Sequence, residues 1–337
     1  MFRTSIRTAF VLSAISASVV LSTVQTASAE PAVSPAPSPV AAATAADPWS
    51  RPFYADPNSP AAQIARAQQP NQVAATIAKV PQARWFTPDN PVSNIRAAVA
   101  RYVDGATASS TLPVLVTYAI PGRDCGGYSA GGLRNATEYQ AWIRELRAGI
   151  GTRPAVVIVE PDAVTSADCL TVPARTARYA MLANAVSQLG AGGTSMVYLD
   201  GGHSRWLSVT ELTSRLRASG IQNARGFTLN VSNFYTTAEQ QTYGEQVSAR
   251  LGGKTYIVDV SRNGRGPAAA APLNWCNPLN RGLGVLPTRQ TTAAHNDANL
   301  WIKNPGQSDG TCERGDPYSG MWFQARAASM LQLRVGW

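Results

Sequence analysis

Carboxylate side chains follow a strongly apolar run near the middle of the chain. Residues Ala155–Val159 are all apolar and rich in β-branched side chains, and Glu160, Pro161 and Asp162 come directly after them. Because proline cannot continue a hydrogen-bonded ladder, we expect a buried strand that ends here and carries both acids at its carboxyl end. Paired carboxylates in one cleft can perform general acid–base catalysis, since the charge of one raises the pKa of the other.

Further acids and aromatic residues follow, or lie near, the ends of other apolar runs. The candidates for a shared site are Tyr118, Asp124, Asp162, Asp200, Asp259 and Asp309, with Trp85, Trp206 and Trp275. Carboxylates and indoles suit acid–base work on a neutral sugar, whose apolar faces stack on tryptophan and whose hydroxyls bond to acids. Taken singly, each aspartate is more simply a helix cap or turn residue, and each tryptophan a core residue. The whole set favours catalysis.

The apolar runs predict strands, and the stretches between them have helical periodicity. The expected strands are Leu112–Ile120, Ala155–Val159, Met196–Leu199, Gly226–Val231, Thr255–Val260 and Leu300–Ile302, and the expected helices include Glu138–Gly149, Ala174–Leu189 and Val209–Ala218. A spacing of about 30 to 45 residues between strands is typical of successive βα units. An α/β barrel and a doubly wound sheet both fit. We prefer the barrel, because a ring of parallel strands brings all these acids to one mouth.

The composition indicates a folded protein with few charges. Of the 337 residues, 45% are hydrophobic and 15% are charged, which excludes disorder for most of the chain. The formal net charge is +9, but the basic residues are scattered and form no nucleic-acid-binding motif. We therefore expect no nucleic-acid partner.

The N-terminal residues have the features of a secretory signal peptide. Arg3 and Arg7 precede an apolar stretch, and Ala27–Ala29 supplies a small-residue cleavage site, so residues 1–29 are predicted to be removed. An uncleaved membrane anchor is the alternative, disfavoured because Ser and Thr interrupt the stretch. Residues 30–47, rich in Pro and Ala, are expected to be a tail or linker, and residues 48–337 one folded domain.

Four cysteines remain after this cleavage: Cys125, Cys169, Cys276 and Cys312. In an exported protein an even count indicates two disulfides, for which three pairings are possible. We favour pairing the first two and the last two, because each pair closes a loop of moderate length. Only two histidines, His203 and His295, are present, and this argues against a zinc site. We expect no metal and no organic cofactor.

Two long motifs carry a resemblance to a known family. The stretch VTYAIPGRDCGGYSAGG (Val116–Gly132) resembles the first signature of glycoside hydrolase family 6, and VIVEPDAV (Val157–Val164) resembles the second. The resemblance extends over VPQARWF, VYLDGGHSRW, DVSRNGRGP, NWCNP and WIKNPGQSDG, and so over nearly the whole chain after Trp49. It implies a distorted seven-stranded parallel α/β barrel with its cleft at the strand carboxyl ends, two disulfides paired as favoured above, and inverting hydrolysis of β-1,4-glucans.

The resemblance also implies roles for individual residues. Asp162 matches the general acid, Asp124 the carboxylate that raises the pKa of this acid, Asp309 the proposed general base, and Tyr118 a residue that crowds the sugar at the point of cleavage. The positions that match or are expected to contribute to substrate binding are Trp85, Asp200, His203, Trp206, Asn233, Trp275, Lys303 and Gln307.

This chain departs from the family pattern at two positions of the site. Ala130 stands where a second serine is common, and Gln307 stands where a glutamate is common, which puts the rate and the subsite preference in question. Arg123 lies next to Asp124 and could oppose the increase of its pKa. Asp259 lies within an apolar run, and for it a structural role and a role in the site are equally open.

The sequence thus predicts a secreted, extracellular endo-β-1,4-glucanase, which acts as a monomer on cellulose or a soluble β-1,4-glucan, without membrane attachment. A cellobiohydrolase of the same family is the first alternative, and long loops that roof the cleft would distinguish it. Segments such as Ala268–Arg281 look too short for such loops. A carbohydrate-binding protein without catalysis is disfavoured by the intact acids. An unrelated barrel lyase or aldolase is disfavoured because Lys303 is the single lysine at an expected strand end.

Overall fold

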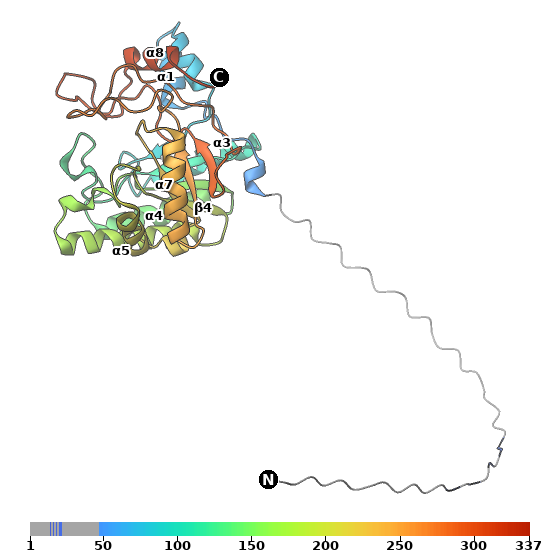
Figure 1. Cartoon of the computed structure of the whole chain (residues 1–337). Coiled ribbons are helices and arrows are strands. Elements are labelled where there is room, and N and C mark those ends of the chain that lie inside the picture. The colour runs from blue at the N-terminus through green and yellow to red at the C-terminus, as the bar shows by residue number, and fades with distance from the viewer. Residues whose placement is uncertain (1–13, 15, 17, 19, 22–46) are drawn as a thin grey trace, which may run out of the picture. The chain divides into compact units, whose positions relative to one another are not determined.

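The structure is a computed structural model that describes residues 47–337 and, near the N-terminus, residues 14, 16, 18, 20 and 21 (Figure 1). The predicted signal peptide (1–29) and the predicted tail (30–47) therefore lie almost wholly outside the described residues. Within the described part of the chain, no helix combines the length and the apolar character needed to cross a membrane.

A single parallel sheet of seven strands organises residues 47–337, with the strands side by side in the order of the sequence. The strands are β1 (Arg84–Phe86), β2 (Val114–Thr117), β3 (Ala155–Val159), β4 (Ser195–Asp200), β5 (Gly226–Leu229), β6 (Thr255–Asp259) and β7 (Asn296–Leu300). The sheet curls so that its two edges meet. Ala83 N donates to Trp301 O at 2.9 Å, and Trp85 Nε1 donates to Ile302 O at 2.8 Å. The predicted distorted seven-stranded α/β barrel is confirmed.

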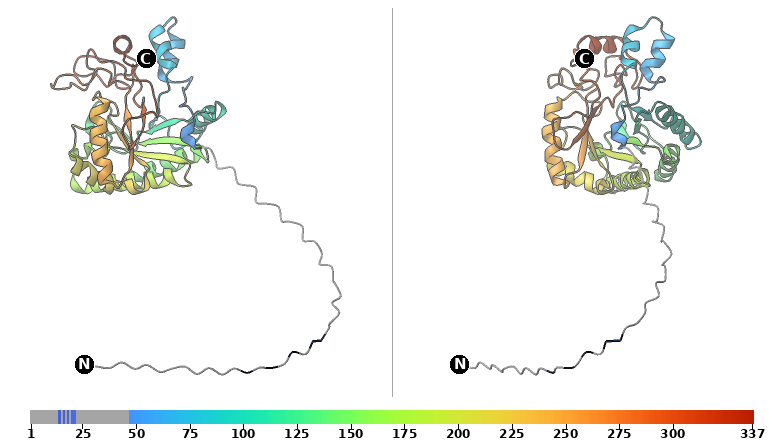
Figure 2. Two further views of the ribbon diagram at one scale, coloured as in Figure 1. Left: turned by 45° about the vertical axis from the view of Figure 1, so that its right-hand side comes forward. Right: turned by 90° about the vertical axis from the view of Figure 1, so that its right-hand side faces the viewer.

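Helices cover the outer face of the sheet, as both views in Figure 2 show. The helices that cover it are α3 (Ile95–Ala108), α4 (Ala136–Ile150), α5 (Val172–Gly190), α6 (Val209–Ala218) and α7 (Thr237–Arg250); the others are α1 (Pro60–Ala67), α2 (Gln72–Ala78) and α8 (Gln324–Gln332). Several begin at a capping side chain followed three residues later by glutamate: Ser208 accepts from Glu211 N, and Thr236 accepts from Glu239 N. Helices α1, α2 and α8 lie together at one end of the molecule (Figure 1).

Alternate residues of each strand face two separate apolar layers. In β3, Val156 and Ile158 pack in the barrel interior, whereas Ala155, Val157 and Val159 pack against the surrounding helices. All five residues are fully buried. This explains the continuous apolar run in the sequence, because a parallel strand with both faces covered has no polar side.

The sequence misplaced two strands at the closure of the barrel. No strand was predicted at β1, which has only three residues, and β7 ends at Leu300, where the sequence-based strand was expected to begin. Strand β7 begins with the polar residues Asn296 and Asp297, so it lacks the apolar run by which the other strands were predicted. Asp297 pairs with Arg225 at 2.8 Å, and Asn296 donates to the side chain of Asn299 at 2.9 Å, so both side chains have a polar partner in the fold.

Candidate active site

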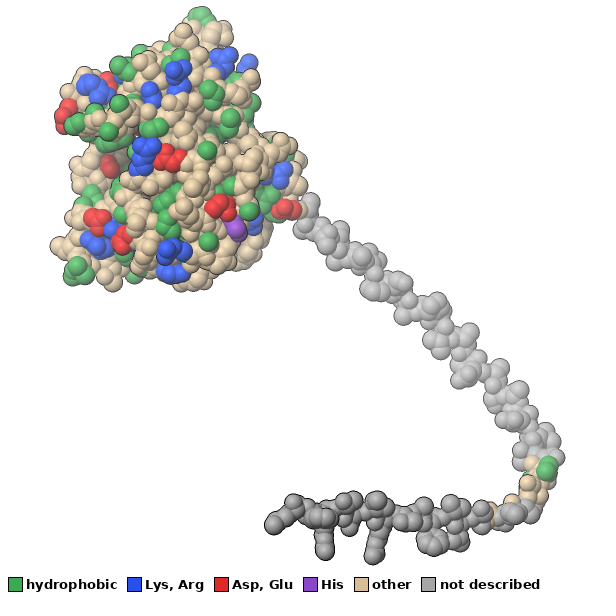
Figure 3. Space-filling view, in the orientation of Figure 1, with side chains coloured by type: hydrophobic (Ala, Val, Ile, Leu, Met, Phe, Trp, Pro, Cys, Tyr) green, Lys and Arg blue, Asp and Glu red, His purple; other side chains and the backbone are tan. Residues whose placement is uncertain are grey.

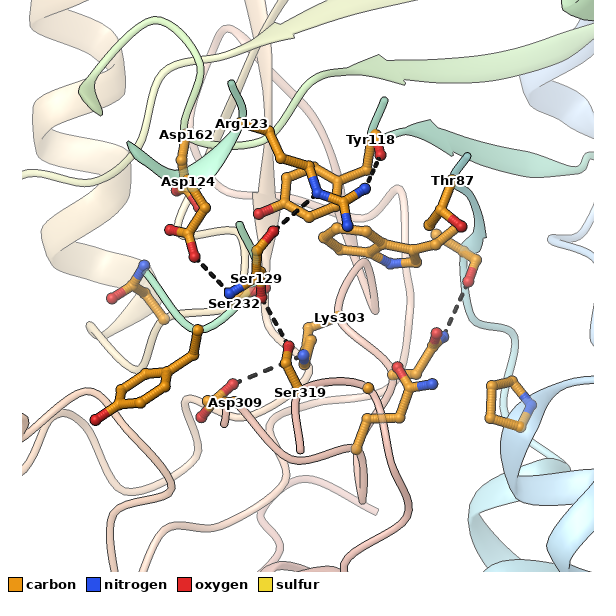
Figure 4. A pocket seen from close by; sticks show the side chains of 18 of the residues that line it. Thr87, Tyr118, Arg123, Asp124, Ser129, Asp162, Ser232, Lys303, Asp309 and Ser319 are labelled. Carbon is orange, nitrogen blue, oxygen red and sulfur yellow. Dashed lines mark hydrogen bonds and ion pairs between the residues drawn. The ribbon is translucent and has the colours of Figure 1, made fainter. Parts of the chain in front are cut away.

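A cleft of about 980 Å³ lies at the carboxyl ends of the strands. Every residue to which the sequence gave a catalytic or substrate-binding role lines it, with the exception of Asp200. In Figure 4, Asp162, Asp124 and Tyr118 lie on one side, and Lys303, Asp309 and Ser319 lie on the facing side. The barrel thus brings together side chains from the ends of strands that are far apart in the sequence.

Asp162 follows β3 and its half-buried side chain reaches the cleft. Its φ of 70° lies in the left-handed region, a strained conformation that is frequent at functional sites. Its hydrogen bonds to other described residues are made by its backbone, and Asp162 N donates to Asp200 Oδ2 at 2.9 Å. Burial raises its pKa well above the usual range, Asp200 and Asp124 raise it further, and Lys303 opposes them. Such a carboxyl group can stay protonated and act as an acid.

Asp200 lies beneath the cleft and does not line it, although the sequence placed it among the substrate-binding residues. It is fully buried. One oxygen accepts from Thr228 Oγ1 at 3.0 Å, and the other accepts from the amides of Asp162 and Gly202 at 2.9 and 3.1 Å. Burial raises its pKa to about 6, against these hydrogen bonds. Its carboxylate therefore contacts the backbone of Asp162 and not the open space of the cleft.

Asp124 stands on the turn after β2, and its backbone is also left-handed, with a φ of 56°. Its Oδ2 accepts from Ser129 N at 2.6 Å. Burial raises its pKa, while this hydrogen bond and Arg123 lower it. The predicted opposition by Arg123 is therefore present, although its guanidinium mainly braces the turn. It donates to Ser129 O at 2.8 Å and Tyr118 O at 2.6 Å.

The loop that carries Asp124 is tied to the facing side of the cleft. Ser129 Oγ lies 2.7 Å from Ser319 Oγ, as Figure 4 shows. The ring of Tyr128 lies 6.1 Å from that of Trp275. Gly310 leaves the space for this contact, because a Cβ there would lie 2.4 Å from the Tyr128 Cβ. The loop is thereby packed over the cleft in this structure.

Asp309 lies on the facing wall and is held by hydrogen bonds to both of its oxygens. Arg262 Nη1 lies 2.8 Å from Oδ1 and 2.9 Å from Oδ2, Asn277 N donates to Oδ2 at 3.0 Å, and Lys303 Nζ is 3.7 Å from Oδ1. Burial lowers the pKa of Lys303, partly offset by Asp309. Arg262 and Asn277 were not predicted from the sequence, although both lie in motifs shared with the family.

Aromatic residues line the rest of the cleft. Trp206 and Trp275 are 38% and 44% exposed, whereas the edge of Trp85 packs on Tyr118 with ring centres 5.2 Å apart. The ring centre of His203 lies 4.4 Å from that of Tyr235, with the two rings tilted by 32°. Burial lowers the pKa of His203 to about 4, so it is neutral near neutral pH. Exposed indoles and a neutral imidazole offer flat, uncharged surfaces to a sugar.

Asp259 has a structural role. It is 1% exposed and accepts hydrogen bonds from the amides of Ser261, Ser232, Ile302 and Lys303 at 2.9 to 3.2 Å. It therefore holds three loops at the floor of the cleft, and the open choice in the sequence is resolved in favour of structure.

Both disulfides flank the site and have the favoured pairing. Cys125 bonds to Cys169, and Cys276 bonds to Cys312. Each ties one wall of the cleft to a neighbouring loop. Across residues 47–337, no group of three or more His, Cys, Asp or Glu side chains is arranged to hold a metal ion.

Acids and indoles at the carboxyl ends of the strands of a parallel α/β barrel suit a glycoside hydrolase. The chain belongs to glycosyl hydrolases family 6, whose family model matches residues 43–333.

Relatives of known name are similar over most of the chain. It is 41% identical to endoglucanase A of Cellulomonas fimi, a match that covers 82% of this chain and 60% of that protein. Endoglucanase 1 of Streptomyces halstedii is also 41% identical, and the match covers 80% of this chain and 86% of that protein. The chain thus spans little more than half of the Cellulomonas protein.

A solved structure extends the comparison. The endoglucanase Cel6 of Mycobacterium tuberculosis, in complex with methyl-cellobiosyl-4-deoxy-4-thio-β-D-cellobioside, is 46% identical, with a TM-score of 0.83. The match covers 86% of this chain and 99% of that one.

Proposed function

We propose that this protein is an endo-β-1,4-glucanase that hydrolyses internal bonds of cellulose with inversion, using Asp162 as the general acid. The observation that carries the proposal is the environment of Asp162. Its carboxyl group reaches the cleft, and its pKa is raised well above the usual range by burial, Asp200 and Asp124. The names of the similar proteins, and the thio-cellobioside bound by the Mycobacterium enzyme, support the substrate class.

In the proposed reaction, Asp162 donates its proton to the glycosidic oxygen as the bond to the anomeric carbon breaks. A water molecule adds to the opposite face of the sugar and loses a proton to a base, which gives inversion. Asp309 is the proposed base. A carboxylate has about four lone-pair positions, and Arg262 and Asn277 occupy one on Oδ1 and two on Oδ2. Oδ1 therefore retains a position for water, next to Lys303 Nζ at 3.7 Å.

The aromatic and polar residues of the cleft have supporting roles in this proposal. Tyr118, 8% exposed and packed between Trp85 and Arg123, would press on the sugar at the point of cleavage. The proposed substrate-binding residues are Trp85, His203, Trp206, Asn233, Trp275, Lys303 and Gln307. Since Asp200 lies beneath the cleft, we propose that it serves catalysis by holding Asp162.

Exposure of the cleft supports cleavage within the chain. The indoles of Trp206 and Trp275 are 38% and 44% exposed, so part of each faces solvent, while the loop that carries Asp124 packs over the cleft between its walls. A glucan chain can enter sideways once this loop opens, whereas a permanent tunnel admits only its end. An exo-acting cellobiohydrolase is the alternative within the family.

We further propose that the enzyme is secreted through its predicted signal peptide, acts outside the cell as a monomer, and consists of a tail (30–47) and a catalytic domain (48–337). Two disulfides support an oxidising compartment. On the face shown in Figure 3, basic and acidic side chains are interspersed, which is consistent with a neutral polymer as the substrate.

The mode of action is tested on a soluble cellulose derivative. Viscosity and reducing ends are followed together for the wild type and Asp162→Ala. We expect a steep loss of viscosity with few reducing ends from the wild type and neither from the variant. Soluble cellobiose with little loss of viscosity would show the exo mode, and full activity of the variant would remove Asp162 from its proposed role.

A further inference from the structure

Two buried side chains of opposite charge hold the backbone that joins Tyr118 to Asp124. The first is Glu160, which is fully buried. Its Oε2 accepts from Ala119 N at 2.9 Å and from Ile120 N at 3.0 Å. Its Oε1 accepts from the hydroxyl of Tyr139 on α4 at 3.0 Å. Glu160 thus accepts hydrogen bonds from the amides of two consecutive residues that follow the end of β2.

The second is Arg178 on α5, which is 1% exposed. Its Nη2 donates to Gly122 O at 2.6 Å and to Pro121 O at 3.3 Å. Its Nη1 lies 4.0 Å from Cys125 Sγ. The guanidinium thus holds the carbonyls of the next two residues, directly before the turn that carries Asp124.

Neither side chain lines the cleft, and neither has a part in the proposed reaction. Burying a charged group costs free energy unless it is well bonded. In keeping with this cost, burial raises the pKa of Glu160 and lowers that of Arg178. Two buried charged side chains, Glu160 and Arg178, thus bind the backbone of residues 119–122, which joins Tyr118 to Asp124. Because burying them costs free energy, we look for a role other than stability.

We propose that Glu160 and Arg178 are positioning residues that fix the Asp124 carboxylate against Asp162, by holding residues 119–122 from the amide side and the carbonyl side. The proposal rests on the proposed function of Asp162 as the acid. Glu160 also precedes Asp162 by two residues, so one carboxylate links the backbones of both loops. The catalytic acid and its partner thereby share one buried frame.

The proposal predicts a change in the pH dependence of activity. The groups that face Asp162 are Asp200 at the end of β4, Asp124 and Tyr118 after β2, and Lys303 after β7. Asp200 and Asp124 raise its pKa, and Lys303 lowers it. If Asp124 moves away, the pKa of Asp162 falls. The acid then loses its proton at lower pH, and the alkaline limb of the kcat profile moves to lower pH.

For Arg178, the sign of this shift separates positioning from a direct effect of charge. Arg178→Met removes a positive charge, which by itself would raise the pKa of Asp162. Glu160→Gln removes a negative charge, which by itself would lower it. Positioning predicts that both variants move the alkaline limb to lower pH, by about one pH unit. We expect kcat to fall about 10- to 100-fold, with KM for cellohexaose unchanged.

Arg225→Met serves as a control for the loss of a charged contact; the Arg225 side chain is 41% exposed, whereas Arg178 is 1% exposed. Arg225 also forms a charged contact at the sheet, with Asp297 at 2.8 Å, but lies outside the cleft. We expect this variant to have a lower Tm and an unchanged alkaline limb of the kcat profile. Arg178→Lys keeps the charge and is the variant to use if Arg178→Met fails to fold. Positioning predicts a partial shift to lower pH, because one ammonium cannot replace the forked guanidinium.

The proposal is overturned if Arg178→Met moves the limb to higher pH, or if Arg178→Lys has the wild-type profile. It is also overturned if the Arg178 variants lower Tm alone, as the control does. Failure of the proposed function would look different, since the wild type itself would then release no sugars from cellohexaose or would keep its activity in Asp162→Ala.

Discussion

The backbone amide of Asp162 donates to the carboxylate of Asp200 at 2.9 Å, and the negative charge of Asp200 also raises the pKa of the Asp162 side chain. One buried group therefore supports the strained backbone at Asp162, whose φ is 70°, and favours the protonated form of its carboxyl group. Geometry and protonation of the proposed acid depend on the same neighbour.

Asp200→Asn should lower the pKa of Asp162, because it removes a negative charge and keeps a similar shape. The amide oxygen can still accept from the backbone of Asp162 and Gly202, and the amide nitrogen can donate to Thr228 Oγ1, which rotates to accept. Since Asp162 must be protonated to act, the alkaline limb of kcat should move to lower pH by about one unit. The measurement is kcat against pH on cellohexaose.

Asp297→Asn is the control for this substitution. Asp297 pairs with Arg225 and does not line the cleft, so its loss should affect Tm and leave the pH profile unchanged. An unchanged profile in Asp200→Asn, or a limb that moves to higher pH, would contradict the role given to Asp200.

Trp206→Ala should weaken the binding of glucan. Its indole lines the cleft and is 38% exposed, which leaves one aromatic face for a sugar ring. Loss of a stacked aromatic side chain costs about 1 kcal/mol beyond the lost area, so we expect KM for cellohexaose to rise about fivefold or more. Trp337, 42% exposed and remote from the cleft lining, is the matched control. Equal values of KM for the two alanine variants would argue against stacking on Trp206.

His203 should make the folded state less stable in acid. Its pKa is about 4 in the folded protein and about 6.5 when unfolded. Between these values the unfolded chain binds a proton that the folded chain does not, so the free energy of unfolding falls as pH decreases from about 6.5 to 4. The loss is at most about 3 kcal/mol. Urea unfolding at several pH values should show a shallower dependence in His203→Asn, and an equal dependence would refute this assignment.

The Cys276–Cys312 disulfide, whose cysteines are 36 positions apart in the sequence, should stabilise the wall that carries Asp309. Replacing both cysteines by serine should lower the free energy of unfolding by about 4 kcal/mol on the chain-entropy model. Activity should fall as well, because Asn277, next to Cys276, holds Asp309. Urea unfolding and activity below the transition check this prediction. A double variant with the wild-type midpoint would contradict it.

Features that depend on a short run of consecutive residues could be predicted from the sequence. The run Ala155–Val159 and the acids after it gave both the strand and the direction of its carboxyl end, because parallel strands leave their signature in unbroken apolar runs. The disulfide pairing followed from loop lengths. The motif around Asp124 and Asp162 placed both acids before any geometry was available.

Features that depend on tertiary contacts could not be predicted. Arg178 lies on a helix, where a single arginine normally faces solvent, and only the fold shows that it points inward to two carbonyls. Strand β7 begins with polar residues whose partners, such as Arg225, lie elsewhere in the sequence. Asp200 looked like a cleft residue because it ends a strand, yet one of its oxygens accepts from the amides of Asp162 and Gly202 and the other from Thr228 Oγ1.

The central claim is that Asp162 acts as the acid of an inverting hydrolysis, and the anomeric protons of the first products test it most directly. Proton NMR is recorded during early hydrolysis of cellohexaose by the wild type and by Asp162→Ala. The account predicts that the α-anomer appears first with the wild type and that the variant yields no products. Initial β-anomer, or undiminished release of sugars by the variant, would contradict it.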